Sequence, residues 1–317
     1  MFFKTRNVEL YYEKTGEGEP LILLHGNGES HEIFNEAIEV LKRKFTVYAI
    51  DTRGHGQSSP VLEIHYDDIA HDIYRFIKRL DIKKPVVYGF SDGGIVALLL
   101  CIKHPDLLER AIVSGVNINP QGIKTKWLLL FKIIYFLTKS ENYKMMITEP
   151  NISFSELEKI TTPVDIICGS RDMIKNSHMK EISDHIPNST YTELIDETHG
   201  SYIIHTDKIA RVITKKVARD IIERVTNMEE LFDILIVKLR NDPEEFFTDE
   251  KIQDYYKIVL SYYENGLWLS DYEADQKGFL PRSLKRGILS QDGFYNFIAD
   301  VVSAEKELER NNNQNSL

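Results

Sequence analysis

The segment Pro85-Val86-Val87-Tyr88-Gly89-Phe90-Ser91-Asp92-Gly93-Gly94-Ile95-Val96-Ala97-Leu98-Leu99 joins a short apolar run, a serine between glycines and a second apolar run. The first run has the length of a buried strand and the second that of a helix. A Gly-x-Ser-x-Gly pattern indicates a nucleophilic serine only in this strand–turn–helix context. Gly89 and Gly93 allow a sharp turn, so the segment predicts a nucleophile at Ser91. The backbone N–H of Asp92, at the helix start, is expected to face an anion.

The same alternation continues on both sides of this segment. From Pro20 to about Glu223, short apolar runs bounded by turn residues alternate with amphipathic helical stretches. Such alternation is typical of parallel strands joined by helical crossovers, so we expect an α/β fold with helices on both faces of a twisted sheet. Residues 8–14 are interpreted as an antiparallel edge strand that pairs with residues 2–6. The expected parallel strands are 21–24, 45–50, 85–89, 111–114, 164–168 and 190–195.

The composition of the chain changes at residue 226. Of its 317 residues, the last 92 contain 10 basic and 18 acidic residues, against 29 and 31 before them. Helical spacing around 228–239 and 249–265, without strand-like alternation, predicts an all-helical module. The sequence therefore predicts an α/β domain over 1–225, a helical module over 226–305 and a polar, disordered tail over 306–317.

A long insertion interrupts the alternation between residues 117 and 160. A segment of this length after a strand is usually a functional cap, which we expect here, although a helix that simply packs on the core is the alternative. Its apolar run, 127–137, contains Lys132 and is too short to span a bilayer about 30 Å thick. We expect this helix to roof the site, with Trp127 and Phe131 against the substrate. Five lysines make the cap basic, which we interpret as a solvated face rather than an anion-binding one: Lys124, Lys126, Lys132, Lys139 and Lys144.

Charge and cysteine content narrow the class of protein. The net charge of −10, without clustered lysine and arginine, argues against a nucleic-acid surface. Cys101 and Cys168 lie in apolar stretches and are interpreted as buried thiols rather than a disulfide. The N-terminal residues lack the apolar segment of a signal peptide, so the expected location is the cytoplasm.

Two further loops follow expected strands. The glycines of His25-Gly26-Asn27-Gly28 let backbone amides approach a substrate oxygen, and we assign the Asn27 N–H as a second oxyanion donor beside Asp92. His25 itself is interpreted as a structural hydrogen-bonding group. The loop from Asp51 to Ser58 is interpreted as support for the floor of the site, although its His55 and Ser58 form an alternative dyad.

Five motifs, in their order along the chain, resemble the α/β-hydrolase superfamily, particularly its small esterase-like members. The resemblance covers about residues 1–225. The Ser-Asp-Gly-Gly version is similar to the valacyclovir-hydrolase and bacterial carboxylesterase branch, but a fold does not fix a substrate. Serine rather than aspartate at position 91 disfavours the dehalogenases and epoxide hydrolases. The motifs are His25-Gly26-Asn27-Gly28, Asp51-x-Arg53-Gly54-His55-Gly56-x-Ser58, Gly89-x-Ser91-x-Gly93-Gly94, Gly169-Ser170-Arg171-Asp172 and His199-Gly200.

The resemblance implies a catalytic triad, because a serine hydroxyl needs a base that a third group orients. In this superfamily the acid and then the histidine follow the nucleophile, on loops after later strands. Asp172 and His199 fit these places, and Asp196 and Glu197 remain alternative acids. The other candidates fit less well because they lie within predicted helices or strands: His178, His185, His205 and Asp165.

The C-terminal segment carries a second resemblance. Residues 268–292, from Trp268-Leu269-Ser270-Asp271-Tyr272 onward, are similar to a small bacterial domain of unknown function. Its acidic residues lack a defined ligand spacing, so we interpret them as a solvated face or helix caps rather than metal ligands. The module is expected to bind a protein partner.

The sequence thus predicts hydrolysis of an ester-like bond of a small molecule through an acyl-enzyme, without a metal or organic cofactor. Thioesterase, amidase or peptidase, carbon–carbon bond hydrolase and cofactor-free haloperoxidase chemistry use the same residues. A proline-type aminopeptidase would need a cap acid to hold the substrate amine, for which Glu141 and Glu149 are the candidates. The alternative from another class is a non-catalytic ligand-binding or partner-recruiting protein. In either case we expect no insertion into a membrane.

Overall fold

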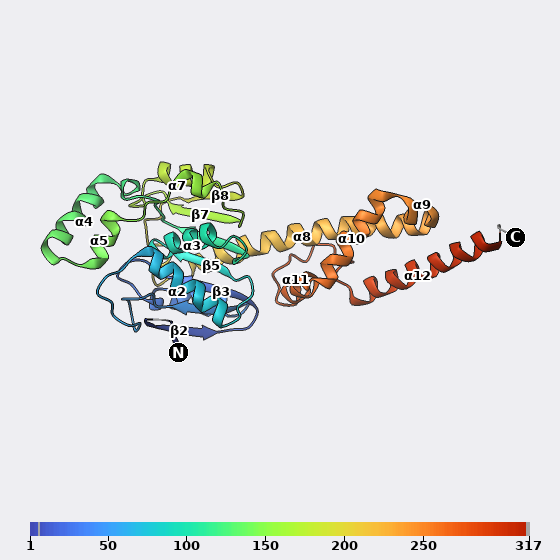
Figure 1. Ribbon diagram of the computed structural model, residues 1–317, viewed down its shortest axis with the longest axis horizontal. Coiled ribbons are helices and arrows are strands. Elements are labelled where there is room, and N and C mark those ends of the chain that lie inside the picture. Colours follow the sequence, from blue (N-terminus) through green and yellow to red (C-terminus); the bar gives the residue numbers. More distant parts are fainter. Residues whose placement is uncertain (6, 315–317) are drawn as a thin grey trace. The chain divides into compact units, whose positions relative to one another are not determined.

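The computed structural model describes residues 1–5 and 7–314, which form two compact units (Figure 1). The units are Met1–Thr214 and Lys215–Leu317, so the chain divides within helix α8 (Lys208–Asn241). The sequence predicts the boundary later, at residue 225. Each unit is described by itself below.

The first unit is built on an eight-stranded sheet in the order β1-β2-β4-β3-β5-β6-β7-β8. The strands from β3 to β8 are parallel, and β1 and β2 form the antiparallel edge. This arrangement confirms the predicted α/β class with a mostly parallel sheet. The strands are β1 (Phe2–Lys4), β2 (Glu9–Thr15), β3 (Glu19–Leu24), β4 (Phe45–Ile50), β5 (Val86–Phe90), β6 (Arg110–Ser114), β7 (Val164–Gly169) and β8 (Ser189–Leu194).

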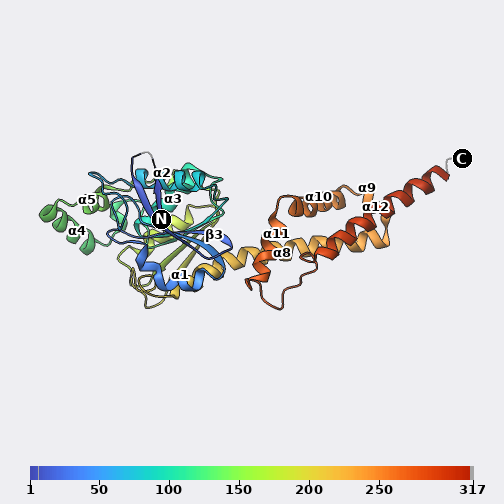
Figure 2. The same ribbon diagram turned by 90° about the horizontal axis from the view of Figure 1, so that it is seen from below.

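Helices cover both faces of this sheet, with α1 on the face opposite to α2 and α3 (Figure 2). Helix α2 (Tyr66–Arg79) shows how the sequence sets an amphipathic cover: aspartates occupy its first turn, basic residues its last, and its apolar side is buried. Helix α3 (Asp92–Lys103) is apolar on all sides and almost wholly buried beside β5. The other covering elements are η1 (His31–Phe34), α1 (Asn35–Leu41) and α7 (Asn176–Asp184).

The core lies between the central strands and these helices. Every residue of β5, β6 and β7 is buried, as is usual for parallel strands that are covered on both faces. Because the carboxyl ends of parallel strands meet at one edge, the loops after β3, β5, β7 and β8 converge there. That edge carries the site described below.

Between β6 and β7 the chain leaves the sheet, over the segment for which the sequence predicts a cap. It forms η2 (Pro120–Gly122), α4 (Thr125–Thr138), α5 (Glu141–Thr148) and the short α6 (Phe154–Leu157). Aromatic contacts join α4 to α5, with the rings of Phe131 and Tyr143 centred 5.9 Å apart. Among the described residues, no helix combines the length and apolar character needed to cross a membrane.

Helices are the only regular secondary structure among the described residues of the second unit. After α8 come α9 (Pro243–Thr248), α10 (Glu250–Glu264), α11 (Leu267–Gln276) and α12 (Gln291–Gln314). Asp242 and Asp249 cap α9 and α10 by accepting backbone N–H bonds. The rings of Phe232, Phe246 and Phe297 pack together in its core.

The end of the chain differs from the sequence-based expectation of a disordered tail over 306–317. Helix α12 continues to Gln314, so residues 306–314 are helical. Residues 315–317 lie outside the described part of the chain.

Candidate active site

Ser91 lies in the turn between β5 and α3, with a backbone φ of +51°. A non-glycine residue in this region is strained and persists only where its surroundings hold it. A Cβ atom on Gly89 would lie 2.2 Å from the Gly93 oxygen, and one on Gly93 would lie 2.3 Å from the Leu24 oxygen. Neighbouring backbone atoms therefore leave no room for a side chain at either position, which explains the two predicted glycines.

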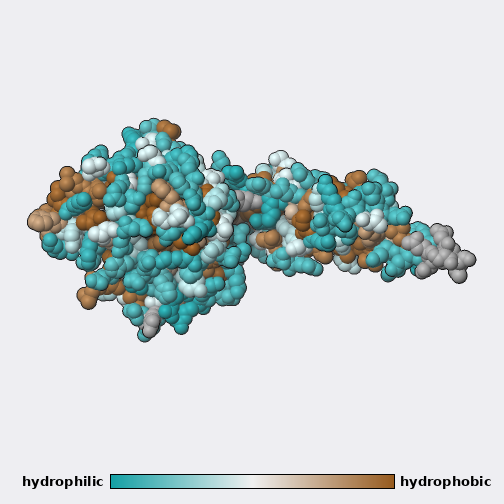
Figure 3. Space-filling model, turned by 45° about the horizontal axis from the view of Figure 1, so that its top comes forward, coloured by the Kyte–Doolittle hydropathy of each residue, from teal (hydrophilic) through white to brown (hydrophobic). Residues whose placement is uncertain are grey.

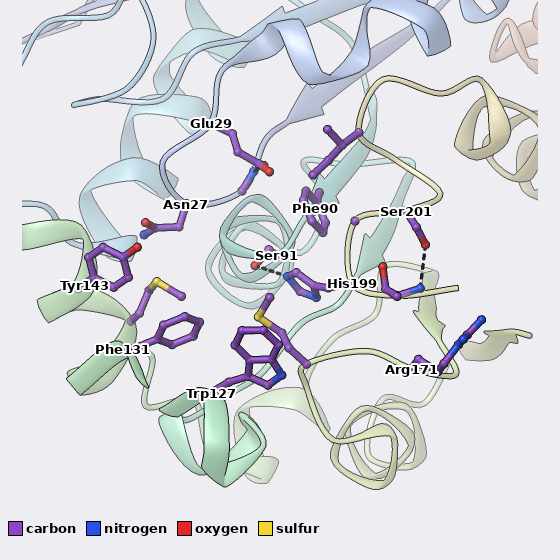
Figure 4. A pocket seen from close by; sticks show the side chains of 16 residues that line it. Asn27, Glu29, Phe90, Ser91, Trp127, Phe131, Tyr143, Arg171, His199 and Ser201 are labelled. Carbon is purple, nitrogen blue, oxygen red and sulfur yellow. Dashed lines mark hydrogen bonds between the residues drawn. The ribbon is translucent and has the colours of Figure 1, made fainter. Parts of the chain in front are cut away.

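The imidazole of His199 lies between Ser91 and Asp172. Its Nε2 is 3.1 Å from the Ser91 Oγ (Figure 4). Its Nδ1 is 2.7 Å from an oxygen of Asp172. When Nδ1–H donates to the carboxylate, Nε2 is left to accept the serine proton. The structure thus brings together three residues from the loops after β5, β7 and β8, in the order that the resemblance implies.

Asp172 has a side chain that is 0% exposed. The oxygen that faces His199 also accepts the Ile174 N–H at 2.8 Å, while Oδ2 is buried and accepts no hydrogen bond from the described residues. The alternative acids lie elsewhere. Asp196 is exposed and pairs with Arg171, and Glu197 accepts hydrogen bonds from Ser201 and Lys208.

Asn27 lies in the loop after β3, and Asp92 directly follows Ser91. Asp92 is the first residue of α3, where backbone N–H groups and the helix dipole favour an anion. Their side chains are tied together, since the Asn27 amide donates to the Asp92 carboxylate at 2.8 Å. Tyr66 donates to the other oxygen of this carboxylate, and burial raises the pKa of Asp92. This side-chain link between the two predicted oxyanion residues was not expected from the sequence.

Beneath the site, His25 has the structural role that the sequence predicts. Its Nδ1 lies 2.8 Å from the Gly26 oxygen and its Nε2 accepts the Thr52 N–H at 3.0 Å. Burial, with His55 nearby, lowers the pKa of His25 to about 4, so the ring is neutral at neutral pH.

The alternative dyad of His55 and Ser58 is not formed. The Ser58 hydroxyl donates to the Asp51 backbone oxygen and accepts the Tyr11 backbone N–H. His55 instead lies 3.2 Å from the Asn142 amide of the cap.

A cavity of about 640 Å³ opens above Ser91 and His199 (Figure 4). Both predicted cap residues, Trp127 and Phe131, line it from α4, and α5 contributes Tyr143 and Met146. Neither of the cap acids considered for an amine is among the lining residues: Glu149 lies 2.6 Å from His65 Nδ1, and Glu141 pairs with Lys144.

Glu29 is a lining residue that sequence reasoning missed. Its carboxylate accepts the Gly26 N–H at 2.9 Å, beside the Ser91 turn. Burial raises the pKa of Glu29 to about 7. The sequence does show an acid directly after the glycine-rich loop. Whether the Glu29 side chain enters the cavity, however, depends on the turn that this loop adopts, which the sequence pattern does not specify.

The part of the chain that the structure describes contains no cluster of three or more His, Cys, Asp or Glu side chains arranged to hold a metal ion.

Comparisons with known proteins match both parts of the chain. Residues 19–128 match the family model of the alpha/beta hydrolase fold, and residues 225–309 match that of a domain of unknown function, DUF4298. Human serine hydrolase BPHL is 27% identical over 239 residues, which are 65% of this chain and 81% of that protein.

Solved structures agree with the fold. One from a study of carboxylesterases of the thaumarchaeon Nitrososphaera gargenis superposes with a TM-score of 0.60 at 20% identity, over 69% of this chain and 98% of that one. The enol-lactonase of Burkholderia xenovorans gives 0.57 at 19% identity, over 67% and 98%. At these identities the likeness concerns the fold alone.

Proposed function

Because the N-terminal unit of this chain is an α/β hydrolase, joined to a DUF4298 domain, we propose that it is a serine hydrolase that cleaves an ester-like bond of a small molecule through an acyl-enzyme. One observation carries the proposal: the His199 imidazole lies within hydrogen-bond distance of both the Ser91 hydroxyl and the Asp172 carboxylate. An isolated serine hydroxyl is a weak nucleophile, and His199 supplies the base that activates it.

In the acylation step, Ser91 Oγ attacks the carbonyl carbon while its proton passes to His199 Nε2. Asp172 stabilises the imidazolium that forms. The Asn27 and Asp92 backbone amides donate to the oxyanion of the tetrahedral intermediate. When that intermediate collapses, the ester C–O bond breaks and His199 returns the proton to the leaving alkoxide.

Deacylation repeats the same exchange with water. His199 takes a proton from the water while the water oxygen attacks the acyl carbon. When the bond between the acyl carbon and Ser91 Oγ breaks, His199 returns the proton to Ser91. Every proton moves between substrate, water and these side chains, so the proposed reaction requires no metal or organic cofactor.

The cavity favours an apolar acyl or aromatic group. Trp127 and Phe131 form an aromatic wall, with their ring centres 6.4 Å apart. The same triad would also serve a thioesterase, an amidase or peptidase, or a carbon–carbon bond hydrolase. Since Glu141 and Glu149 do not line the cavity, the two cap acids give no support to a proline-type aminopeptidase.

A ligand-binding protein that uses the same cavity without turnover is the alternative from another class. The expected working place is the cytoplasm, which the two buried free thiols, Cys101 and Cys168, support. For the helical unit, we keep the proposal that it binds a protein partner, with no nucleic acid involved.

The test is hydrolysis of a panel of nitrophenyl esters by the full chain and by its Ser91→Ala variant. We expect turnover of short and aromatic acyl esters, and a loss of about 10⁴-fold or more in the variant. No turnover by either protein would support the ligand-binding alternative, and equal turnover by both would contradict the role of Ser91 as the nucleophile.

A further inference from the structure

Helix α4 is apolar on more than one side. Within Thr125–Thr138 the only charged residues are Lys126 and Lys132. One side carries Trp127 and Phe131, four residues apart, and lines the cavity above Ser91. This side accounts for part of the apolar content of the helix and leaves the rest unexplained.

The opposite side of α4 exposes large apolar side chains to solvent. They recur at steps of three and four residues, which places them on one face of the helix. Figure 3 shows brown, hydrophobic surface at the cap end of the N-terminal unit. This face, which we name the outer α4 face, consists of Leu129 (58% exposed), Leu130 (40%), Ile133 (49%), Phe136 (72%) and Leu137 (73%). Contiguous apolar surface of this kind in a water-exposed position marks an interaction site.

Positive charge borders the outer α4 face. Lys132 follows Leu129 by three residues and precedes Phe136 by four, so it lies beside this face. The ammonium of Lys139 lies 4.9 Å from the centre of the Phe136 ring. Between residues 111 and 140 the sequence contains no aspartate or glutamate, although the whole chain has a net charge of −10. The charge of this helix is therefore opposite in sign to that of the protein.

We propose that the outer α4 face docks on an anionic lipid surface. The leucines and Phe136 enter the boundary between headgroups and acyl chains, while Lys126, Lys132 and Lys139 contact the lipid phosphates. A helix of 14 residues is too short to span the bilayer, so it lies along the surface and the binding is peripheral. The same helix thus binds the surface on one side and roofs the cavity on the other.

A second copy of this chain is the competing occupant, and charge argues against it. In a two-fold dimer through the outer α4 face, each lysine-bordered face would meet an identical one. With no acidic residue between 111 and 140, α4 itself offers no carboxylate to the facing lysines. An anionic lipid surface supplies both partners, because its acyl chains contact the apolar side chains and its phosphates contact the lysines.

The test uses the full-length Ser91→Ala protein, so that binding is measured independently of hydrolysis. It is sedimented with vesicles of phosphatidylglycerol and phosphatidylcholine in equal parts, and with vesicles of phosphatidylcholine alone. We expect binding to the anionic vesicles that weakens with added salt. Added Phe136→Ser and Leu137→Ser substitutions should lower the affinity roughly tenfold or more. Neutralising Lys126, Lys132 and Lys139 to Gln should lower it about 100-fold.

The matched control is Leu62→Ser, which removes an apolar side chain that is 94% exposed elsewhere on the unit. It should bind the vesicles like the parent protein. Circular dichroism checks that each variant is folded. Equal binding to neutral vesicles, or no binding to either kind, would overturn the proposal. So would a concentration-dependent dimer in analytical ultracentrifugation that the Phe136→Ser and Leu137→Ser substitutions abolish.

Discussion

Asp271 in the helical unit and Asp172 in the N-terminal unit are both buried aspartates, and they have different partners. In the helical unit, Asp271 accepts Arg224 Nε at 2.8 Å and the Tyr262 hydroxyl at 2.9 Å. In the hydrolase unit, Asp172 faces the titratable imidazole of His199, which in turn reaches Ser91. Removing a buried carboxylate from beside a guanidinium leaves that cation uncompensated, so we expect Asp271 to act on stability. We propose that Asp172, beside an imidazole that contacts a hydroxyl, acts on proton transfer instead.

The largest expected effect comes from a change at Asp172. Asp172→Asn keeps the shape of the side chain but cannot hold the imidazolium, so ester turnover should fall about 10⁴-fold. The free energy of unfolding should change little, because the amide can still contact His199. Initial rates on a nitrophenyl ester and a urea unfolding curve measure the two quantities. A large loss of stability with activity retained would reverse the assignment of the two aspartates.

The corresponding change in the helical unit should have the opposite consequence. Asp271→Asn leaves the Arg224 guanidinium facing an uncharged amide, which should destabilise this unit by about 3–5 kcal/mol. Ester hydrolysis per folded molecule should be unchanged.

The measurement is chemical unfolding followed by the helical circular dichroism signal. Asp254→Asn serves as the control, since that exposed aspartate pairs with Lys257 at the surface, and it should cost less than about 1 kcal/mol. Equal effects of the two substitutions would contradict the structural role of Asp271.

The two tryptophans sharpen the same comparison. Trp268 stacks on Tyr263 and donates to the Ile288 oxygen at 2.9 Å, so Trp268→Ala should destabilise the helical unit by about 2–3 kcal/mol. Trp127 lines the cavity instead, and Trp127→Ala should raise KM for aromatic esters about tenfold. Unfolding curves and steady-state kinetics, measured on both variants, distinguish the two roles. If Trp127→Ala lowers the free energy of unfolding but leaves KM unchanged, Trp127 does not contact the substrate.

The smallest predicted effect concerns Glu29, a partly buried carboxyl that accepts the Gly26 backbone N–H. Its pKa of about 7 lies above the usual 4.5, so the folded state binds a proton more tightly than the unfolded one. Its contribution to stability is present below about pH 4.5 and is lost as the pH rises to 7. Glu29→Gln removes this pH dependence. The free energy of unfolding of the variant, relative to that of the parent, should therefore rise by about 1–2 kcal/mol between pH 4.5 and pH 8. Unfolding curves of both proteins at the two pH values measure this rise, and the same difference between variant and parent at both would refute the raised pKa.

Much of the hydrolase unit could be predicted because its signals are local. Apolar runs bounded by turn residues mark all six parallel strands, and the positions of Asp172 and His199 after β7 and β8 follow from chain order. The residues that were missed depend on tertiary approach. Tyr66 reaches Asp92 from the start of α2, a contact between residues 26 positions apart that no local pattern encodes.

The helical unit was harder to delimit for a related reason. Helix α8 runs without a break through the division between Thr214 and Lys215, so no turn residue marks the boundary there. The polar end of the chain likewise resembles a tail in composition, yet residues 306–314 continue α12. The apolar run of α4 indicated a buried or cavity-lining helix, and only the structure shows that one face of it is exposed.

The reactivity of Ser91 tests the proposed serine-hydrolase mechanism most directly. Treatment with a fluorophosphonate, followed by mapping of the adduct by mass spectrometry, measures it. We predict a single covalent adduct on Ser91 in the parent protein and in the Asp271→Asn variant, with much slower labelling in Asp172→Asn. No adduct at Ser91, or labelling at the same rate in Asp172→Asn as in the parent, would contradict it.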